Sequence, residues 1–217
     1  MGDILNWDNK FFQGLSKIVD CILVSILWLI CSLPVVTMGA ASSAMYYTIN
    51  KVIRNNHGYV TKEFFHSFAN CFKQSTIVWL VFWVIAAFLG ADTYIMWGSL
   101  KAGNAIGNLL FVFLVFIAFD MMWVMYALTY ISRFQNTMKN IMKNALLMAV
   151  ADFGKTLLLF LILAASIFAI WMMPFLAVLI PGFVTCLLNL IFEKIFRKYM
   201  SEEDIKEEDE RNREYLN

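Results

Sequence analysis

Long apolar segments alternate with short polar ones along most of this chain. An α-helix rises about 1.5 Å per residue, so about 20 apolar residues are needed to cross the hydrocarbon core of a bilayer. Six segments approach or reach this length: residues 18–33, 35–53, 75–97, 105–131, 156–173 and 174–192. The pattern predicts an all-α fold, a polytopic membrane bundle of about six transmembrane helices in a single domain covering residues 1–200.

Prolines divide the shorter apolar segments into pairs. Pro34 follows the first segment directly, Pro174 begins the sixth, and Pro181-Gly182 interrupts it. Proline lacks an amide hydrogen and clashes with the preceding turn, so it fits a turn or the start of a helix better than a helix interior. We therefore expect residues 18–53 to form a hairpin of two helices.

Two segments between the apolar stretches have the spacing of amphipathic helices. Residues 61–74 place phenylalanines among polar side chains, and residues 134–150 place Met and Ile opposite lysines. Such helices lie in the inner membrane interface, with basic residues near lipid headgroups, or offer a surface to a protein partner. The two interpretations are compatible. The candidate residues for a cytoplasmic partner surface are Phe68, Asn70, Phe72, Lys73, Arg133, Asn140 and Lys143.

Composition and charge place the chain in a membrane. It is 61% hydrophobic and 15% charged, with a mean hydropathy of +0.68, whereas soluble domains are about 45–50% apolar and 25% charged. The bilayer is thus the expected partner, and a net charge of +1 gives no indication of nucleic acid. Lys and Arg flank one side of every predicted crossing and Lys101 alone lies on the other, which predicts cytoplasmic N- and C-termini. The highly charged residues 201–217 are expected to form a cytoplasmic tail.

The segment after the first proline, LPVVTMGAASSAMYY at residues 33–47, is rich in small residues. One interpretation is the cleavage site of a signal peptide, although the preceding leader is long and carries three aspartates. We favour a packing face in the second span, because small residues four positions apart let two helix backbones approach closely. The residues that we assign to this face and motif are Pro34, Thr37, Gly39, Ala40, Ser43, Ala44, Tyr46 and Tyr47.

Asp120 lies near the middle of the fourth predicted span. A carboxylate at that depth is costly and usually faces the bundle interior, a cavity or a partner. Two interpretations remain open. Asp120 is either protonated and hydrogen-bonded to a polar residue such as Asn189, or it serves as a proton or substrate site.

Residue motifs for catalysis are absent from the sequence. It contains no HExxH, no G-x-S-x-G and no P-loop motif, and His57 and His66 lack the spacing of zinc ligands. The four cysteines, at positions 21, 31, 71 and 186, form no C-x-x-C pair and are expected to be reduced thiols. We therefore expect a protein that is not an enzyme and binds no metal or cofactor.

Three stretches of the sequence resemble the YesL family of bacterial membrane proteins. These are WLICSLPVVTMGAASSAMYYTINKVIR, GYVTKEFFHSFANCFKQ, and TYISRF with MKNALLMAVADFGKTLLL. The resemblance implies a multi-pass protein of the bacterial plasma membrane whose function is unknown and whose members are encoded beside carbohydrate ABC importers. It carries over no catalytic residue.

Two functions follow as expectations from these observations. The first is an integral membrane accessory or regulatory subunit that associates with the permease of a carbohydrate ABC importer, as the resemblance implies. The alternative is an autonomous small-solute or proton-coupled transporter that uses Asp120.

Overall fold

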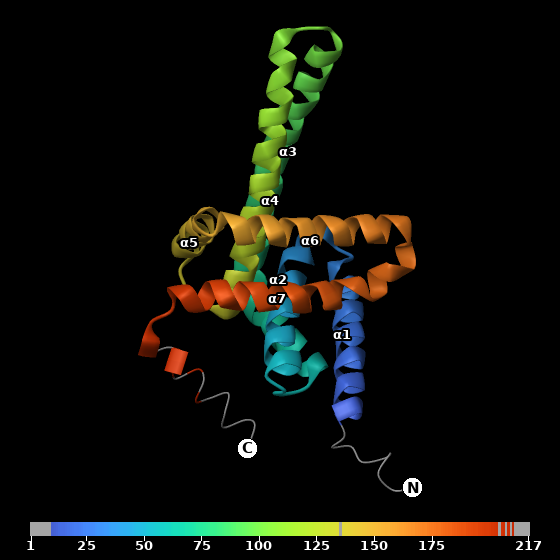
Figure 1. The fold of residues 1–217 in the computed structure, drawn as a ribbon, viewed down its shortest axis with the longest axis vertical. Helices are drawn as coiled ribbons and strands as arrows, with labels where there is room; N and C mark the ends of the chain where they lie inside the picture. The colour runs from blue at the N-terminus through green and yellow to red at the C-terminus, as the bar shows by residue number, and fades with distance from the viewer. Residues whose placement is uncertain (1–9, 135, 204, 207, 209, 211–217) are drawn as a thin grey trace, which may run out of the picture.

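The computed structural model describes residues 10–134, 136–203, 205, 206, 208 and 210, and the described residues contain helices but no strand. Figure 1 shows two helical hairpins that lie crosswise to each other. The elements in chain order are α1 (Lys10–Ser32), η2 (Val35–Thr37), α2 (Met38–Thr48), the π-helical η3 (Ile49–Arg54), α3 (Val60–Lys101), η4 (Ala105–Leu109), α4 (Leu110–Arg133), α5 (Met138–Ala151), α6 (Phe153–Met172), η5 (Pro174–Val178) and α7 (Ile180–Tyr199). The fold class predicted from the sequence is thus confirmed as all-α.

A turn at Pro34 separates α1 from α2. The backbone of Pro34 is extended, and the Thr37 hydroxyl donates a hydrogen bond to the carbonyl oxygen of Cys31 at 2.6 Å, which secures the turn. The chain then runs back beside α1 (Figure 1). The predicted span 35–53 is helical along its length, because η2, α2 and the π-helical η3 follow one another without a break, but only the 11 residues of α2 are regular α-helix.

The longest helix, α3, joins two elements that the sequence pattern separated. It runs for 42 residues, from Val60 to Lys101, and contains both the amphipathic segment 61–74 and the predicted span 75–97. No proline interrupts it, so the backbone hydrogen bonds continue across the change from amphipathic to apolar sequence. The prediction of a separate helix over residues 61–74 was wrong at its C-terminal boundary.

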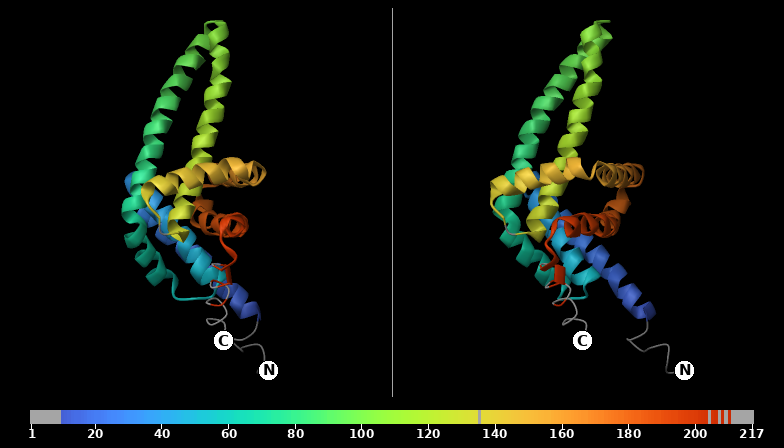
Figure 2. Two further views of the ribbon diagram at one scale, coloured as in Figure 1. Left: turned by 90° about the vertical axis from the view of Figure 1, so that its left-hand side faces the viewer. Right: turned by 60° about the vertical axis from the view of Figure 1, so that its left-hand side comes forward.

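Helices α3 and α4 form a long hairpin that extends beyond the rest of the molecule (Figure 2). At its tip Gly103 has φ +77°, a left-handed conformation that glycine adopts without steric cost. The two helices diverge away from the tip, and the base of the hairpin packs against α2 and α5.

The C-terminal half of the chain forms a second hairpin. Pro174 begins η5, which turns the chain between α6 and α7, and Pro181 lies in the first turn of α7, where its missing amide costs little. In Figure 1, α6 and α7 lie side by side and cross the direction of α3 and α4. The six apolar segments therefore do not form a bundle of parallel crossings.

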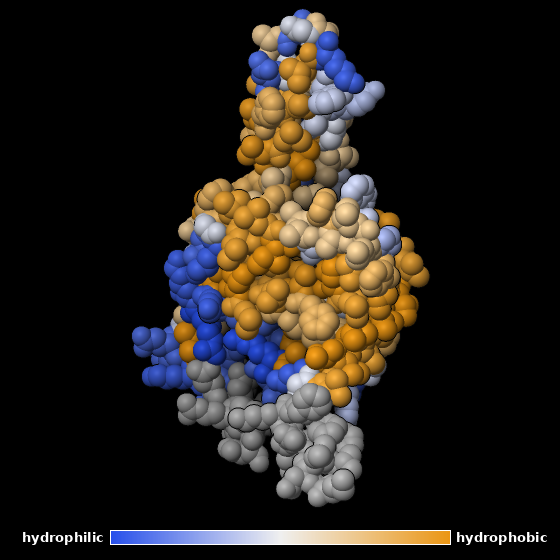
Figure 3. Space-filling model, turned by 45° about the vertical axis from the view of Figure 1, so that its right-hand side comes forward, coloured by the Kyte–Doolittle hydropathy of each residue, from blue (hydrophilic) through white to orange (hydrophobic). Residues whose placement is uncertain are grey.

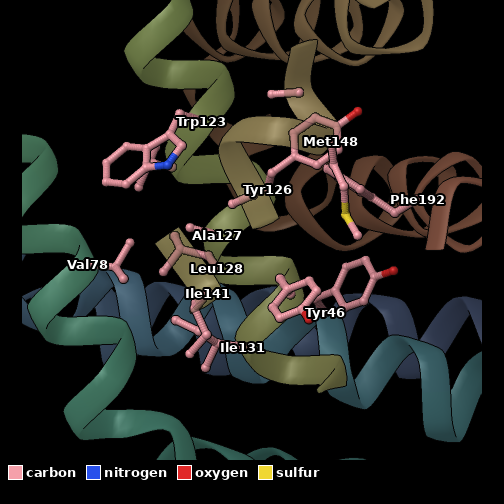
Figure 4. Packing of buried hydrophobic residues seen from close by; sticks show 14 of the residues in the cluster. Tyr46, Val78, Trp123, Tyr126, Ala127, Leu128, Ile131, Ile141, Met148 and Phe192 are labelled. Atoms are coloured by element: carbon pink, nitrogen blue, oxygen red, sulfur yellow. The ribbon is translucent and has the colours of Figure 1, made fainter. Parts of the chain in front are cut away.

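The main hydrophobic core lies where the two hairpins cross. Aromatic rings dominate it, and the rings of Tyr126 and Phe192 meet edge to face with centroids 5.0 Å apart, a favoured geometry for aromatic pairs. Figure 4 shows side chains from α2, α3, α4, α5 and α7 converging there, among them Tyr46, Val78, Trp123, Tyr126, Ala127, Leu128, Ile131, Ile141, Met148 and Phe192.

Four segments are long and apolar enough to cross a membrane: Gly14–Ser32, Val60–Lys101, Ala105–Arg133 and Phe153–Met172. Figure 3 shows a continuous hydrophobic surface between a hydrophilic hairpin tip and a hydrophilic base. A surface this apolar requires lipid around it, so the chain is a membrane protein. The prediction of six crossings is not confirmed, because neither the helix formed by α2 and η3 nor α7 is among these four segments, and α7 carries Glu193, Lys194, Arg197 and Lys198.

Candidate functional site

A group of polar and charged side chains surrounds the buried carboxylate of Glu193 where α2, η3, α4 and α7 meet. We call it the Glu193 cluster, and its members are Tyr46, Arg54, Arg133, Asn189 and Glu193. Glu193 is only 1% exposed. A buried carboxylate persists only when charges and hydrogen bonds compensate the loss of water, so the geometry around it indicates what the cluster does.

Both carboxylate oxygens of Glu193 have partners. Oε1 accepts a hydrogen bond from the Tyr46 hydroxyl at 3.1 Å. Oε2 lies 3.2 Å from Nη2 of Arg133 and 3.6 Å from Nη1 of Arg54. Arg54 also donates a hydrogen bond to the side-chain oxygen of Asn189 at 3.2 Å. One carboxylate thus joins three segments that are far apart in the sequence.

Each member of the Glu193 cluster is positioned by its own helix. Asn189 and Glu193 are four residues apart on α7, so they face the same side. Arg133 is the last residue of α4, and the π-helical turn η3 brings Arg54 to the same place. Arg133 makes a second ion pair with Glu208, so two arginines face two glutamates.

The geometry of the cluster is that of an internal anchor. The ion pairs and hydrogen bonds of the Glu193 cluster link α2, η3 and α4 to α7. Removing one partner of a buried ion pair costs about 3–5 kcal/mol, because the remaining charge stays buried. The cluster therefore couples the two crossed hairpins.

The sequence analysis missed this cluster and misplaced two of its members. Arg133 was predicted on a cytoplasmic partner surface, but its side chain is only 18% exposed and is engaged by Glu193. Asn189 was suggested as a partner of Asp120, but its oxygen binds Arg54. The available signal was Glu193 itself, a carboxylate placed after an apolar run and four residues beyond Asn189.

The small residues of the second helix lie where α2 contacts α3 and α4. A Cβ atom added to Gly39 would lie 2.7 Å from Cβ of Trp79 and 2.9 Å from the carbonyl oxygen of Ser75. Ser43 donates a hydrogen bond to the carbonyl oxygen of Leu128 at 2.9 Å and accepts one from the Ser75 hydroxyl at 2.8 Å. The small side chains let three backbones approach, and the serines satisfy polar groups at the contact.

The other residues assigned to the small-residue motif differ in their exposure and contacts. Ala40 and Ala44 are fully buried, whereas Pro34 is exposed at the turn. Tyr46 reaches the Glu193 cluster, and Tyr47 points elsewhere, accepting a hydrogen bond from Lys51 at 3.3 Å. Thus adjacent tyrosines serve different contacts.

A hydrogen bond links the two amphipathic segments, which are far apart in sequence. The side-chain amide of Gln74 on α3 donates a hydrogen bond to the carbonyl oxygen of Asn136, just before α5, at 3.2 Å. Phe68 is half-buried. The other candidate residues of these segments have exposed side chains: Asn70, Phe72, Lys73, Asn140 and Lys143. We call these five the basal face.

Asp120 lies in a groove between α3, α4 and α5. Only 6% of its surface is exposed, and its oxygen Oδ2 is buried without a hydrogen-bond partner among the described residues. The groove has a volume of about 360 Å³. The protonated, hydrogen-bonded Asp120 considered in the sequence analysis therefore finds no acceptor or donor within the described part of the chain.

Comparison with known protein families matches part of the chain. Residues 21–93 match the family described as "Protein of unknown function, DUF624". This segment runs from α1 into α3 and contains the small residues that pack α2. No curated protein and no solved structure matches the chain. Over these helices the chain is similar to a family whose function has not been assigned.

Proposed function

We propose that this protein is a non-enzymatic accessory subunit of the bacterial plasma membrane, a member of the YesL family that associates with the permease of a carbohydrate ABC importer. The resemblance of the successive sequence motifs supports the family and the class of partner. The match of residues 21–93 to a family of unknown function supports the family assignment.

The observation that carries the proposal is the basal face. The hydrogen bond from Gln74 to the carbonyl oxygen of Asn136 links α3 to the segment just before α5, and the side chains of Phe72, Lys73 and Lys143 are exposed. An exposed aromatic ring among basic residues is suited to a protein partner that presents acidic and apolar groups. The Glu193 cluster supports the same conclusion, because its charges hold the helices together instead of lining an open path.

Purification from the native membrane tests this function. A tagged copy is extracted in mild detergent from cells grown on a complex glycan, and mass spectrometry identifies the bound proteins. We expect stoichiometric permease subunits, and we expect the charge reversals Lys73→Glu and Lys143→Glu to reduce their recovery. Lys101→Glu, at the opposite end of the molecule, is the matched control.

Two outcomes would contradict the accessory function. The first is recovery of the protein alone across several detergents. The second is a deletion strain whose sugar uptake and importer assembly equal those of the parent strain. A control variant that loses the partner as strongly as Lys73→Glu would show that the basal face is not the contact.

The second candidate function is a small transporter, and it is favoured by the buried oxygen Oδ2 of Asp120, which has no hydrogen-bond partner among the described residues. Charged groups inside membrane segments often mark ion or substrate pathways. In proteoliposomes, solute or proton flux that depends on the protein and disappears in Asp120→Asn would support this candidate. Flux that persists in Asp120→Asn would remove its mechanism.

A further inference from the structure

The groove beside Asp120 combines apolar walls with one acidic group. Its lining comes from α3, α4 and α5 and consists of Ile85, Leu89, Phe116, Phe119, Asp120, Trp123 and Leu146. Three of these side chains are aromatic, and Asp120 alone is charged. The volume of about 360 Å³ falls in the range of small-molecule sites, about 300–1,000 Å³.

No donor from the described part of the chain satisfies Asp120. The nearest indole along α4 belongs to Trp123, and its N–H group is already engaged by the carbonyl oxygen of Met142 at 3.1 Å. Oδ2 of Asp120 therefore stays buried without a partner. Asp120 is ten residues from the start of α4 at Leu110, or about 15 Å along the helix, and so lies well inside its apolar length.

We propose that this groove binds a lipophilic ammonium ion, a ligand with one cationic amine on a compact apolar body. The ammonium group pairs with the carboxylate of Asp120 and donates the hydrogen bond that Oδ2 lacks. The rings of Phe116, Phe119 and Trp123 surround the ligand, and aromatic faces attract cations. The ligand enters from the bilayer, because Phe116 and Ile85 at the groove are exposed on the apolar surface.

The chemistry of the lining selects this ligand class. A carboxylate repels anions, and the apolar walls would leave the hydroxyl groups of a sugar without hydrogen bonds. A neutral apolar molecule would leave Oδ2 unpartnered. The site is independent of the accessory function, because its binding is a property of the isolated protein.

Isothermal titration calorimetry tests the site with the full chain in lipid nanodiscs, after subtraction of the heat measured with empty nanodiscs. The probe is aminoadamantane, which is compact, apolar and cationic at neutral pH. Its neutral counterpart is adamantanol, which has the same body and a hydroxyl in place of the amine. We expect one saturable site for aminoadamantane and binding of adamantanol that is at least about tenfold weaker.

Two variants locate the site. Asp120→Asn removes the charge and is expected to weaken aminoadamantane binding about tenfold or more. Leu89→Trp fills the groove and is expected to block binding while Asp120 is still present. The control Asp92→Asn changes an exposed carboxylate on α3 and should bind as the parent protein does.

Three outcomes would overturn the proposal. They are equal binding of the amine and the alcohol, unchanged affinity in Asp120→Asn, and unchanged affinity in Leu89→Trp. The thermal transition of each variant in nanodiscs shows whether it is folded. If Asp120→Asn does not fold, Leu89→Trp and the comparison of the two ligands still decide the question. None of these results depends on whether permease subunits copurify.

Discussion

The buried carboxylate of Glu193 lies 3.2 Å from the partly exposed guanidinium of Arg133, a residue 60 positions earlier in the sequence. This ion pair connects the end of α4, in the first hairpin, with α7, in the second. Because charges inside a membrane protein are expensive to leave unpaired, the contact fixes how the two hairpins cross.

Removing the charge of Glu193 is expected to destabilise the protein. In Glu193→Gln the guanidinium groups of Arg54 and Arg133 lose their common partner but stay partly exposed and keep Asn189 and Glu208, so we expect a loss of about 1–3 kcal/mol in the free energy of unfolding. Denaturation in mixed micelles measures it. The control is Glu202→Gln, at an exposed position. A Glu193→Gln variant as stable as this control would show that the ion pairs contribute nothing to the fold.

Gly39 is expected to tolerate no side chain. An added Cβ would lie 2.7 Å from Cβ of Trp79, so Gly39→Ala forces α2 away from α3 and should cost about 1–3 kcal/mol. The matched control is Gly90→Ala, where an added Cβ meets nothing within 4 Å. Thermal unfolding of both variants in the same detergent compares them. Equal transition temperatures would contradict the close approach of α2 and α3.

Oxidation is expected to join α1 to α7. The sulfur atoms of Cys21 and Cys186 lie 3.4 Å apart, so a small movement brings them to bonding distance. Copper phenanthroline should therefore produce a disulfide between these two residues, detected as a linked peptide by mass spectrometry. Cys31 and Cys71 act as internal controls and should remain reduced. Their oxidation in place of Cys21 and Cys186 would contradict the packing of α1 on α7.

Acid is expected to weaken the contact between Asp152 and the end of α7. Burial by itself raises the pKa of Asp152, but hydrogen bonds from Tyr199, Lys198 and Lys155 outweigh it and hold the pKa below its ordinary value. The Tyr199 hydroxyl donates to Oδ2 of Asp152 at 2.8 Å. A lowered pKa in the folded state favours folding once the carboxyl group is ionised.

The stability difference between the parent protein and Asp152→Asn should therefore depend on pH. It is fully present above the ordinary carboxyl pKa of about 3.9 and disappears as the pH falls through the lowered value. Unfolding of both proteins in micelles across this acid range measures the difference. A stability difference between the two proteins that grows on acidification would show that the pKa of Asp152 is not lowered in the folded state.

The hairpin tip and the basal face are expected on opposite sides of the membrane. In a variant without its native cysteines, Lys101→Cys should react with a membrane-impermeant maleimide in intact cells, because the charge distribution places the tip outside. Lys143→Cys should react only after permeabilisation. Both positions are exposed, so a reversed pattern would mean a reversed orientation.

Some elements of the fold could be predicted from sequence because their causes are local. Pro34 ends α1 regardless of how the rest of the chain packs, because its ring and its missing amide hydrogen act within one helical turn. The apolar stretches of α1, α3, α4 and α6 likewise follow from composition and length. The boundary between residues 61–74 and the next span could not be predicted, because a helix continues through a change of polarity when no residue breaks it.

The candidate sites show the same division. Asp120 was identified from sequence, because a carboxylate inside an apolar run is unusual whatever the tertiary structure around it. The Glu193 cluster was missed, because its members come from segments centred near positions 54, 133 and 193. Nothing local at Arg133 distinguishes an arginine at a membrane surface from one that pairs inside the protein.

By itself the sequence determined that this chain is a helical membrane protein, because hydropathy, helix length and proline act over a few turns. Only the tertiary structure decided that the two hairpins cross, that Arg54 and Arg133 share Glu193, and that no described residue donates a hydrogen bond to Oδ2 of Asp120. These features depend on contacts between distant segments. Which segments meet is set by the packing of the whole chain.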